Sequence, residues 1–101
     1  MVARFEWDAA KAATNLRKHG VSFEVAVRAF ADPFALTGPE RIEHSEQRWQ
    51  TLGMVDGCLL LLVAHTVLAL KADNQVIEVI RIISARQADK KERRRYEQEI
   101  R

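Results

Sequence analysis

The residue types best suited to chemistry are concentrated near the C-terminus, where an apolar segment carries polar side chains. Val76 to Ala85 is largely apolar, which predicts a buried strand. Arg81 and Ser84 lie inside this segment and Arg86 follows it. A guanidinium group presents a planar fork of N–H donors that binds carboxylate or phosphate in a bidentate manner. A strand that delivers these three side chains therefore predicts a phosphate-rich partner, because an ordinary core has no use for them.

A basic helix should follow this strand directly. Asp89 and Glu92 stand three residues apart, a capping-box pattern that predicts a helix beginning near Lys90. The formal net charge of the chain is only +2, but the segment from Arg81 onwards holds eight Lys or Arg against four Asp or Glu. The preceding residues hold eight against ten. This asymmetry indicates a polyanion or an acidic protein as partner, and a solvated helix face explains the charge alone equally well.

Strict alternation along the C-terminal strand would place Arg81 on one face and Ser84 and Arg86 on the other. A charged guanidinium inside an apolar strand needs a partner, because burying an unpaired charge is costly. Arg81 should therefore meet a buried carboxylate or line a groove in which a phosphate takes the place of that carboxylate. The candidate carboxylates are Glu6, Glu46 and Glu78.

The three histidines offer groups that can titrate near neutral pH. His19 precedes Gly20 at a predicted helix end, where it could act as a general acid or base, although complementing the helix dipole is the simpler interpretation. His65 lies in an apolar strand and is best interpreted as a core residue with its hydrogen bonds satisfied. His44 lies in a predicted loop. Their spacing matches no zinc motif, so no metal site is expected.

A second predicted strand begins with charged and aromatic residues. Glu46 and Arg48 could contribute to a site, and Trp49 should point to the face opposite Arg48. Trp49 is most simply a core residue, and base stacking is the alternative. The single cysteine, Cys58, begins an apolar run and is expected to be a small core residue.

Composition excludes several classes of protein. One cysteine cannot form an internal disulfide and fits a reducing cytoplasm. The longest apolar run, residues 58–64, is too short to span a bilayer, and residues 1–7 lack the apolar centre of a signal peptide. The sequence contains neither a Gly-rich phosphate loop nor a Ser-centred elbow motif. These features predict a cytoplasmic protein without a cofactor.

The pattern of the whole chain predicts one α+β domain over residues 1–101, with the element order β-α-α-β-β-β-α. An antiparallel sheet should carry the two N-terminal helices on one face and the basic helix on an edge or on the other face. Phe34 to Ser45 has no clear period and is expected to be a surface loop. The other expected elements are a strand over 4–8, helices from 9 to 19 and from 23, strands over 47–54, 58–70 and 76–86, and a helix from about 90.

Several of these blocks, taken in order, resemble the BrnT family of toxins. The resemblance is carried by Phe5-Glu6-Trp7-Asp8, Asn15-Leu16-Arg17-Lys18-His19-Gly20-Val21-Ser22-Phe23-Glu24, Phe30-Ala31-Asp32-Pro33, Glu46-Gln47-Arg48-Trp49 with Gly53, and Arg81-Ile82-Ile83-Ser84-Ala85-Arg86 followed by Lys90-Lys91-Glu92-Arg93 and Tyr96-Glu97. It implies a toxin of a type II toxin–antitoxin system with a RelE-like fold, a metal-independent ribonuclease that cleaves RNA and inhibits translation. It also implies a hetero-oligomer with a BrnA-type antitoxin. The toxin would contact operator DNA only through this antitoxin, and the complex would regulate transcription of its own operon.

A ribonuclease that uses the 2′-hydroxyl of RNA needs a proton acceptor, a proton donor and cations where charge builds on phosphorus. The hypothesis assigns Arg81 and Arg48 to the phosphate and His19 or Glu46 to the protons. The expected RNA contacts are Lys18, Arg86, Arg94, Trp49 and Tyr96, the last two either as base platforms or as packing residues.

A different class of function remains open: a non-catalytic binding module, whose basic end docks an acidic antitoxin or nucleic acid. Such a protein would be a toxin that has lost catalysis and kept its binding surface. Both hypotheses predict salt-sensitive binding, and only the first predicts a new RNA end. A metal-dependent nuclease is a third possibility and would lose its activity in EDTA.

Overall fold

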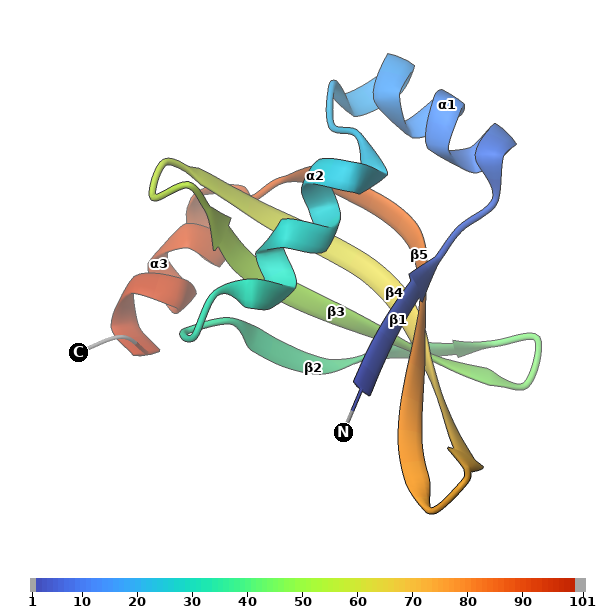
Figure 1. The fold of residues 1–101 in the computed structure, drawn as a ribbon. Helices are drawn as coiled ribbons and strands as arrows, with labels where there is room; N and C mark the ends of the chain where they lie inside the picture. The colour runs from blue at the N-terminus through green and yellow to red at the C-terminus, as the bar shows by residue number, and fades with distance from the viewer. Residues whose placement is uncertain (1, 100–101) are drawn as a thin grey trace.

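A computed structural model describes residues 2–99 as a five-stranded sheet with helices on both sides (Figure 1). The strands lie side by side in the order β1-β5-β4-β3-β2, so the first and last strands of the chain are neighbours. The elements are β1 (Val2–Glu6), α1 (Ala9–His19), α2 (Phe23–Val27), a 3₁₀ turn η1 (Arg28–Ala31), β2 (Leu36–Glu43), β3 (Glu46–Val55), β4 (Leu59–Ala72), β5 (Gln75–Gln87) and α3 (Lys90–Glu99).

The helix boundaries follow from local signals in the sequence. The Asp8 carboxylate accepts hydrogen bonds from the backbone N–H groups of residues 10 and 11, and α1 ends at Gly20 with φ 70°. The Ser22 hydroxyl accepts a hydrogen bond from the backbone N–H of residue 25 at the start of α2. Asp89 and Glu92 cap α3 reciprocally, with N···O distances of 2.8 and 2.9 Å. The predicted helix starts are therefore confirmed.

The segment predicted as a surface loop, Phe34 to Ser45, is instead mostly a strand. β2 pairs antiparallel with β3 as the edge of the sheet, and a two-residue turn with φ values of 52° and 64° at His44 and Ser45 connects them. The pairing shifts register between Pro39 and Ile42. This irregularity, together with a proline that is tolerated only at a sheet edge, removed the alternation that would have indicated a strand.

The sheet is mixed, whereas an antiparallel sheet was predicted. β2 to β5 form a continuous antiparallel meander, which leaves β5 with one free edge. β1 pairs with that edge in the parallel direction, with Val2 opposite Ile77 and Glu6 opposite Arg81. Strand direction depends on this long-range pairing, which alternation within a short segment does not encode.

One face of the sheet, called the α2 face, carries Leu61, Val63 and His65 of β4 and packs under α2 and η1. His65 is buried there against Phe30. Its Nε2 lies 2.8 Å from the Thr51 hydroxyl, and burial lowers its pKa. The prediction of a satisfied core histidine is confirmed. The prediction for Cys58 is wrong, because the tight turn before β4 leaves that side chain exposed.

The opposite face, called the α3 face, carries Leu62, Ala64 and Thr66 of β4, and α3 covers only one end of it (Figure 1). Tyr96 of α3 packs there with Leu52. The C-terminal helix was predicted to cover either an edge or the opposite face of the sheet, and it covers the opposite face. The rest of the α3 face carries the charged side chains from which a site can be built.

α1 lies along the part of the β5 edge that β1 leaves free, and a buried asparagine joins the two. The Asn15 amide donates to the backbone oxygen of Ala85 at 2.8 Å and to that of Val21 at 2.9 Å, and its oxygen accepts from the N–H of Ala85 at 3.1 Å. Leu16, the largest apolar side chain of α1, is 50% exposed. These hydrogen bonds fix the rotation of α1 at the strand edge, and Ala12 packs against the core beside them.

Candidate active site

A β-bulge in β5 changes which side chains share a face. Ala64 pairs with Ser84 and His65 with Ile82, so Ile83 is an extra residue that has no partner on β4. Without the bulge, alternation would separate Arg81 from Ser84, as was predicted. With it, Arg81, Ser84 and Arg86 all lie on the α3 face, opposite Thr66, Ala64 and Leu62 respectively.

Arg81 lies in an open position and is not buried. Its Nε and Nη2 each lie 3.2 Å from an oxygen of Glu6, in a pair whose side chains are 63% and 44% exposed. Of the three candidate carboxylates, Glu6 is therefore the partner. A small cavity of about 150 Å³ surrounds this pair and brings Glu46 to it. The cavity is lined by Glu6, Glu46, Thr66, Leu68, Val79 and Arg81.

Arg48 approaches the same region from β3. It lies two residues after Glu46 on the same strand, and Trp49 beside it pairs with His65, which places Arg48 on the α3 face. Its Nη1 lies 3.0 Å from the Glu43 carboxylate. Trp49 lies on the α2 face and is partly buried. The structure thus places Arg48 on the same face of the sheet as Arg81, brings Glu46 into the Arg81 cavity, and places Trp49 on the other face.

Arg86 is held by the start of α3. Its two terminal nitrogens lie 2.9 Å from the two oxygens of Glu92, the residue that also caps the helix. The Arg86 hydrogen bonds hold the pKa of Glu92 below its usual range, and the same hydrogen bonds raise the pKa of Arg86. A bidentate pair in which both oxygens are engaged is a fixed structural contact. Arg86 therefore fastens α3 to β5.

Tyr96 is also engaged in holding α3. It is 4% exposed, and its hydroxyl donates to the Asp32 carboxylate at 2.5 Å. Burial and this hydrogen bond raise the pKa of Tyr96 to about 12. Burial alone would raise the pKa of Asp32. The hydrogen bonds from Tyr96 and from the N–H groups of Met54 and Phe34 outweigh burial and lower it. Tyr96 therefore joins α3 to the segment after η1.

Replacing Tyr96→Phe should lower the free energy of unfolding by about 1.5–3 kcal/mol at pH 7, the usual contribution of a hydrogen bond to a charged group. Because the pKa of Asp32 is lowered in the fold, its contribution is present above the unfolded value and is lost as pH falls through the folded one. The difference between wild type and variant should therefore shrink toward pH 3. Urea unfolding at the two pH values measures this, and an equal difference at both would contradict the Tyr96–Asp32 contact.

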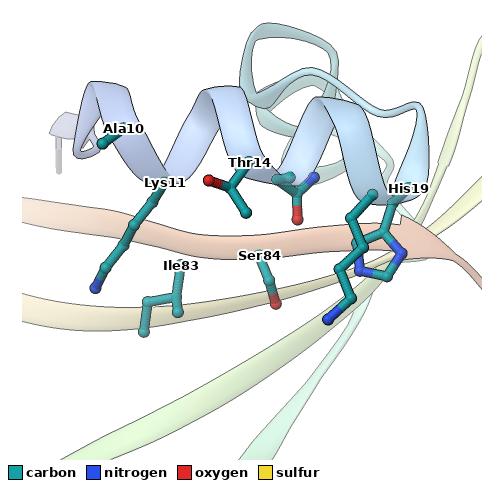
Figure 2. A pocket seen from close by; sticks show the side chains of 8 residues that line it. Ala10, Lys11, Thr14, His19, Ile83 and Ser84 are labelled. Atoms are coloured by element: carbon teal, nitrogen blue, oxygen red, sulfur yellow. The ribbon is translucent and has the colours of Figure 1, made fainter.

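Lys18 and His19 lie apart from the Arg81 cavity, at the end of α1. They line a second cavity of about 320 Å³ between α1 and β5, together with Ser84 (Figure 2). Sequence reasoning did not single out Lys11, which lines the same cavity; its spacing of seven residues from Lys18 was the available signal. Thr66, which lines the Arg81 cavity, was also missed, and the sequence around it has no comparable pattern. Arg94 is exposed on α3, away from both cavities.

Within residues 2–99, no group of three or more His, Cys, Asp or Glu side chains has the arrangement of a metal site. In the same range, none of the helices combines the length and the apolar character needed to cross a membrane.

Comparison with known proteins identifies the family. Residues 7–92 match the family model described as the ribonuclease toxin BrnT of type II toxin–antitoxin systems. The crystal structure of the Brucella abortus ribonuclease toxin BrnT superimposes with a TM-score of 0.60 and 21% sequence identity, covering 89% of this chain and 100% of that one. No curated protein sequence matches the chain. Since the family model spans most of the sequence, the chain belongs to the BrnT family of type II toxin–antitoxin ribonuclease toxins.

Proposed function

We propose that this chain is an endoribonuclease with a RelE-like fold that cleaves RNA without a metal ion and thereby inhibits translation. The observation that carries the proposal is the cavity on the α3 face, where an arginine with an exposed side chain lies beside two carboxylates, Glu6 and Glu46. Exposed ion pairs contribute only about 0–1 kcal/mol, so an RNA phosphate can replace Glu6 as the partner of Arg81 at little cost.

The proposed reaction is an attack by the 2′-oxygen of the RNA on the adjacent phosphorus. Glu46 takes the proton of the 2′-hydroxyl, the bond from phosphorus to the 5′-oxygen breaks, and a 2′,3′-cyclic phosphate remains. Arg81 and Arg48 stabilise the charge that builds on the phosphate oxygens. The departing 5′-oxygen gains a proton from solvent or from His19. Glu46 is the better proton acceptor of the two predicted groups because it shares a cavity with Arg81, whereas His19 lines the other one.

The remaining predicted RNA contacts divide by their surroundings. Lys18 is kept as an RNA contact because it lines an open cavity, and Arg94 because it is exposed on the basic helix. Trp49 is kept only as a packing residue, since it lies on the face that α2 covers. Arg86 and Tyr96 are assigned to holding α3, because their polar groups are already engaged within the chain.

The test is cleavage of an end-labelled RNA by purified protein in EDTA. Wild type should cut, leaving 2′,3′-cyclic or 3′-phosphate ends, and Glu46→Gln should be slower by about a hundredfold, the lower range for loss of a general base. The RNA ends are identified by phosphatase sensitivity and mass spectrometry. An RNA with a single 2′-deoxy nucleotide at the cut position should resist cleavage there.

The matched control is Glu24→Gln, which removes an exposed carboxylate on α2, away from the α3 face. It should leave the rate unchanged. Activity that disappears in EDTA would refute the metal-free route. Unchanged cleavage by Glu46→Gln would remove Glu46 from the proposed reaction and leave His19 as the proton acceptor.

We further propose a BrnA-type antitoxin as partner, with operator DNA reached only through it. Membership of a toxin–antitoxin family supports the antitoxin, and the exposed Leu68 and Leu70 beside the Arg81 cavity suit a protein surface. Those leucines also favour the rival function, a module that binds its partner without cutting RNA. Co-purification with an antitoxin but no RNA cleavage, in EDTA or in Mg²⁺, would support the rival.

A further inference from the structure

The cavity between α1 and β5 is lined by two lysines and a histidine and by no carboxylate. Its lining residues are Ala10, Lys11, Thr14, Asn15, Lys18, His19, Ile83 and Ser84. Figure 2 shows Lys11 and His19 at its two ends, with the hydroxyls of Thr14 and Ser84 between them. Two ammonium groups and two hydroxyls are hydrogen-bond donors of the kind that bind phosphate oxygens.

The arrangement follows from the way α1 is fixed to the sheet. Lys11, Thr14 and Lys18 are spaced i, i+3 and i+7, so they lie on one side of the helix. Asn15, held by both backbone groups of Ala85, fixes the helix rotation and directs that side toward β5. The bulge at Ile83 then places Ser84, the neighbour of Ala85, at the cavity wall. The cavity is therefore positioned by two independent features of the fold.

The contrast with the α3 face indicates which ligand this cavity takes. Each of the arginines Arg48, Arg81 and Arg86 there has a carboxylate partner within the chain. Across residues 2–99, neither Lys11, Lys18 nor His19 forms an ion pair within 4.0 Å. An anion entering this cavity displaces only water, whereas at Arg81 it has to displace Glu6.

We propose that this cavity is a phosphate subsite, in which Lys11, Lys18, Thr14 and Ser84 bind the phosphate oxygens. The inference rests on the proposed function: the phosphate belongs to the RNA backbone and lies beside the one that is cut at Arg81. Ser84 lies three residues along β5 from Arg81, roughly 10 Å or less given the bulge. The substrate is then a single strand that crosses the edge of β5 and contacts the protein at two phosphates.

The first measurement uses inorganic phosphate as the probe and requires no catalysis. NMR signals of residues 11, 14, 18 and 84 should shift saturably when phosphate is added to the isotope-labelled protein. The shifts should disappear in the double variant Lys11→Ala with Lys18→Ala and persist in Lys71→Ala, which removes an exposed lysine at the distant end of β4. Absent shifts, or shifts that survive the double variant, would overturn the subsite.

The second measurement decides whether the phosphate belongs to a nucleic-acid strand. Single-stranded DNA serves as the probe, because without a 2′-hydroxyl it cannot be cut by the proposed route. Lys11→Ala should weaken its binding several-fold and reduce the slope of log K against log salt by about 0.7, the value for one lost contact to a single strand. An unchanged slope would restrict the cavity to free phosphate and refute the strand. Intact phosphate and DNA binding without RNA cleavage would refute the proposed function alone.

Discussion

Replacing Arg81→Ala should slow RNA cleavage by about 10²–10³, the usual loss when one well-placed group stabilising transition-state charge is removed. The loss should appear mainly in kcat, because the guanidinium interacts more strongly with the phosphorane than with the ground-state phosphate. The fold should be unaffected, since the Arg81–Glu6 pair is largely exposed and such pairs add about 0–1 kcal/mol. Single-turnover cleavage of labelled RNA, with thermal unfolding measured alongside, tests both statements.

The structure offers a close control for this substitution. Arg28 also has an exposed side chain, 53%, and is likewise paired with a carboxylate, that of Asp56, but it lies in η1 on the α2 side of the sheet. Arg28→Ala should therefore leave the cleavage rate within twofold of wild type. Arg81→Lys should recover only part of the rate, because an ammonium lacks the bidentate fork. A loss of twofold or less for Arg81→Ala would contradict the role of this residue in catalysis.

The helices could be predicted from the sequence because their signals are local. Asp8, Ser22 and Asp89 are each followed by the backbone groups that they cap, and Gly20 provides the left-handed residue that ends α1. The tight turn before β4 has a signal of the same local kind in Asp56 and Gly57, both of which have positive φ. Such signals need only a few neighbouring residues, so they are present in the sequence itself.

The features that sequence reasoning missed all depend on distant parts of the chain. β2 is irregular and is a strand because it pairs with β3, and the direction of β1 is set by its pairing with the free edge of β5. The bulge at Ile83 is set by pairing with β4. Leu16 is exposed, whereas its polar neighbour Asn15 is buried against the sheet edge by hydrogen bonds. Hydrophobic periodicity cannot reveal a helix attached by hydrogen bonds.

Several residues of the candidate site could be named from the sequence, but their arrangement could not be predicted. Arg81 was expected to meet a buried carboxylate or a phosphate, and Glu6, one of its three candidate carboxylates, is its partner in an exposed pair. Its exposure was not foreseen, because a largely apolar strand suggests burial on both faces. Arg86 and Tyr96 resembled RNA contacts by residue type, yet both are engaged with carboxylates of the chain. Residue type indicates which partner a side chain can bind, and only the fold decides whether it is already bound.

Replacing Asn15→Ala should lower the free energy of unfolding by about 3 kcal/mol or more. The substitution leaves three backbone groups without a partner, the N–H and oxygen of Ala85 and the oxygen of Val21, and each buried unpaired group costs about 1–3 kcal/mol. A chain of this size has a total stability of about 5–15 kcal/mol, so this is a large fraction of it. The melting temperature should fall by about 12 °C or more.

Two companion variants separate this hydrogen-bond effect from a general weakening of α1. Leu16→Ala, at the neighbouring and half-exposed position, should change stability by less than 1 kcal/mol. Asn15→Asp keeps the size of the side chain but directs a carboxylate at the two backbone oxygens, so it should be at least as harmful as alanine. Asn15 also fixes the rotation of α1, so in Asn15→Ala the cavity of Lys11 and Lys18 should be the first part to open. Hydrogen exchange should therefore rise at Ala85 before it rises in β4. A stability loss below 1 kcal/mol for Asn15→Ala would mean that α1 is held by its apolar contacts after all.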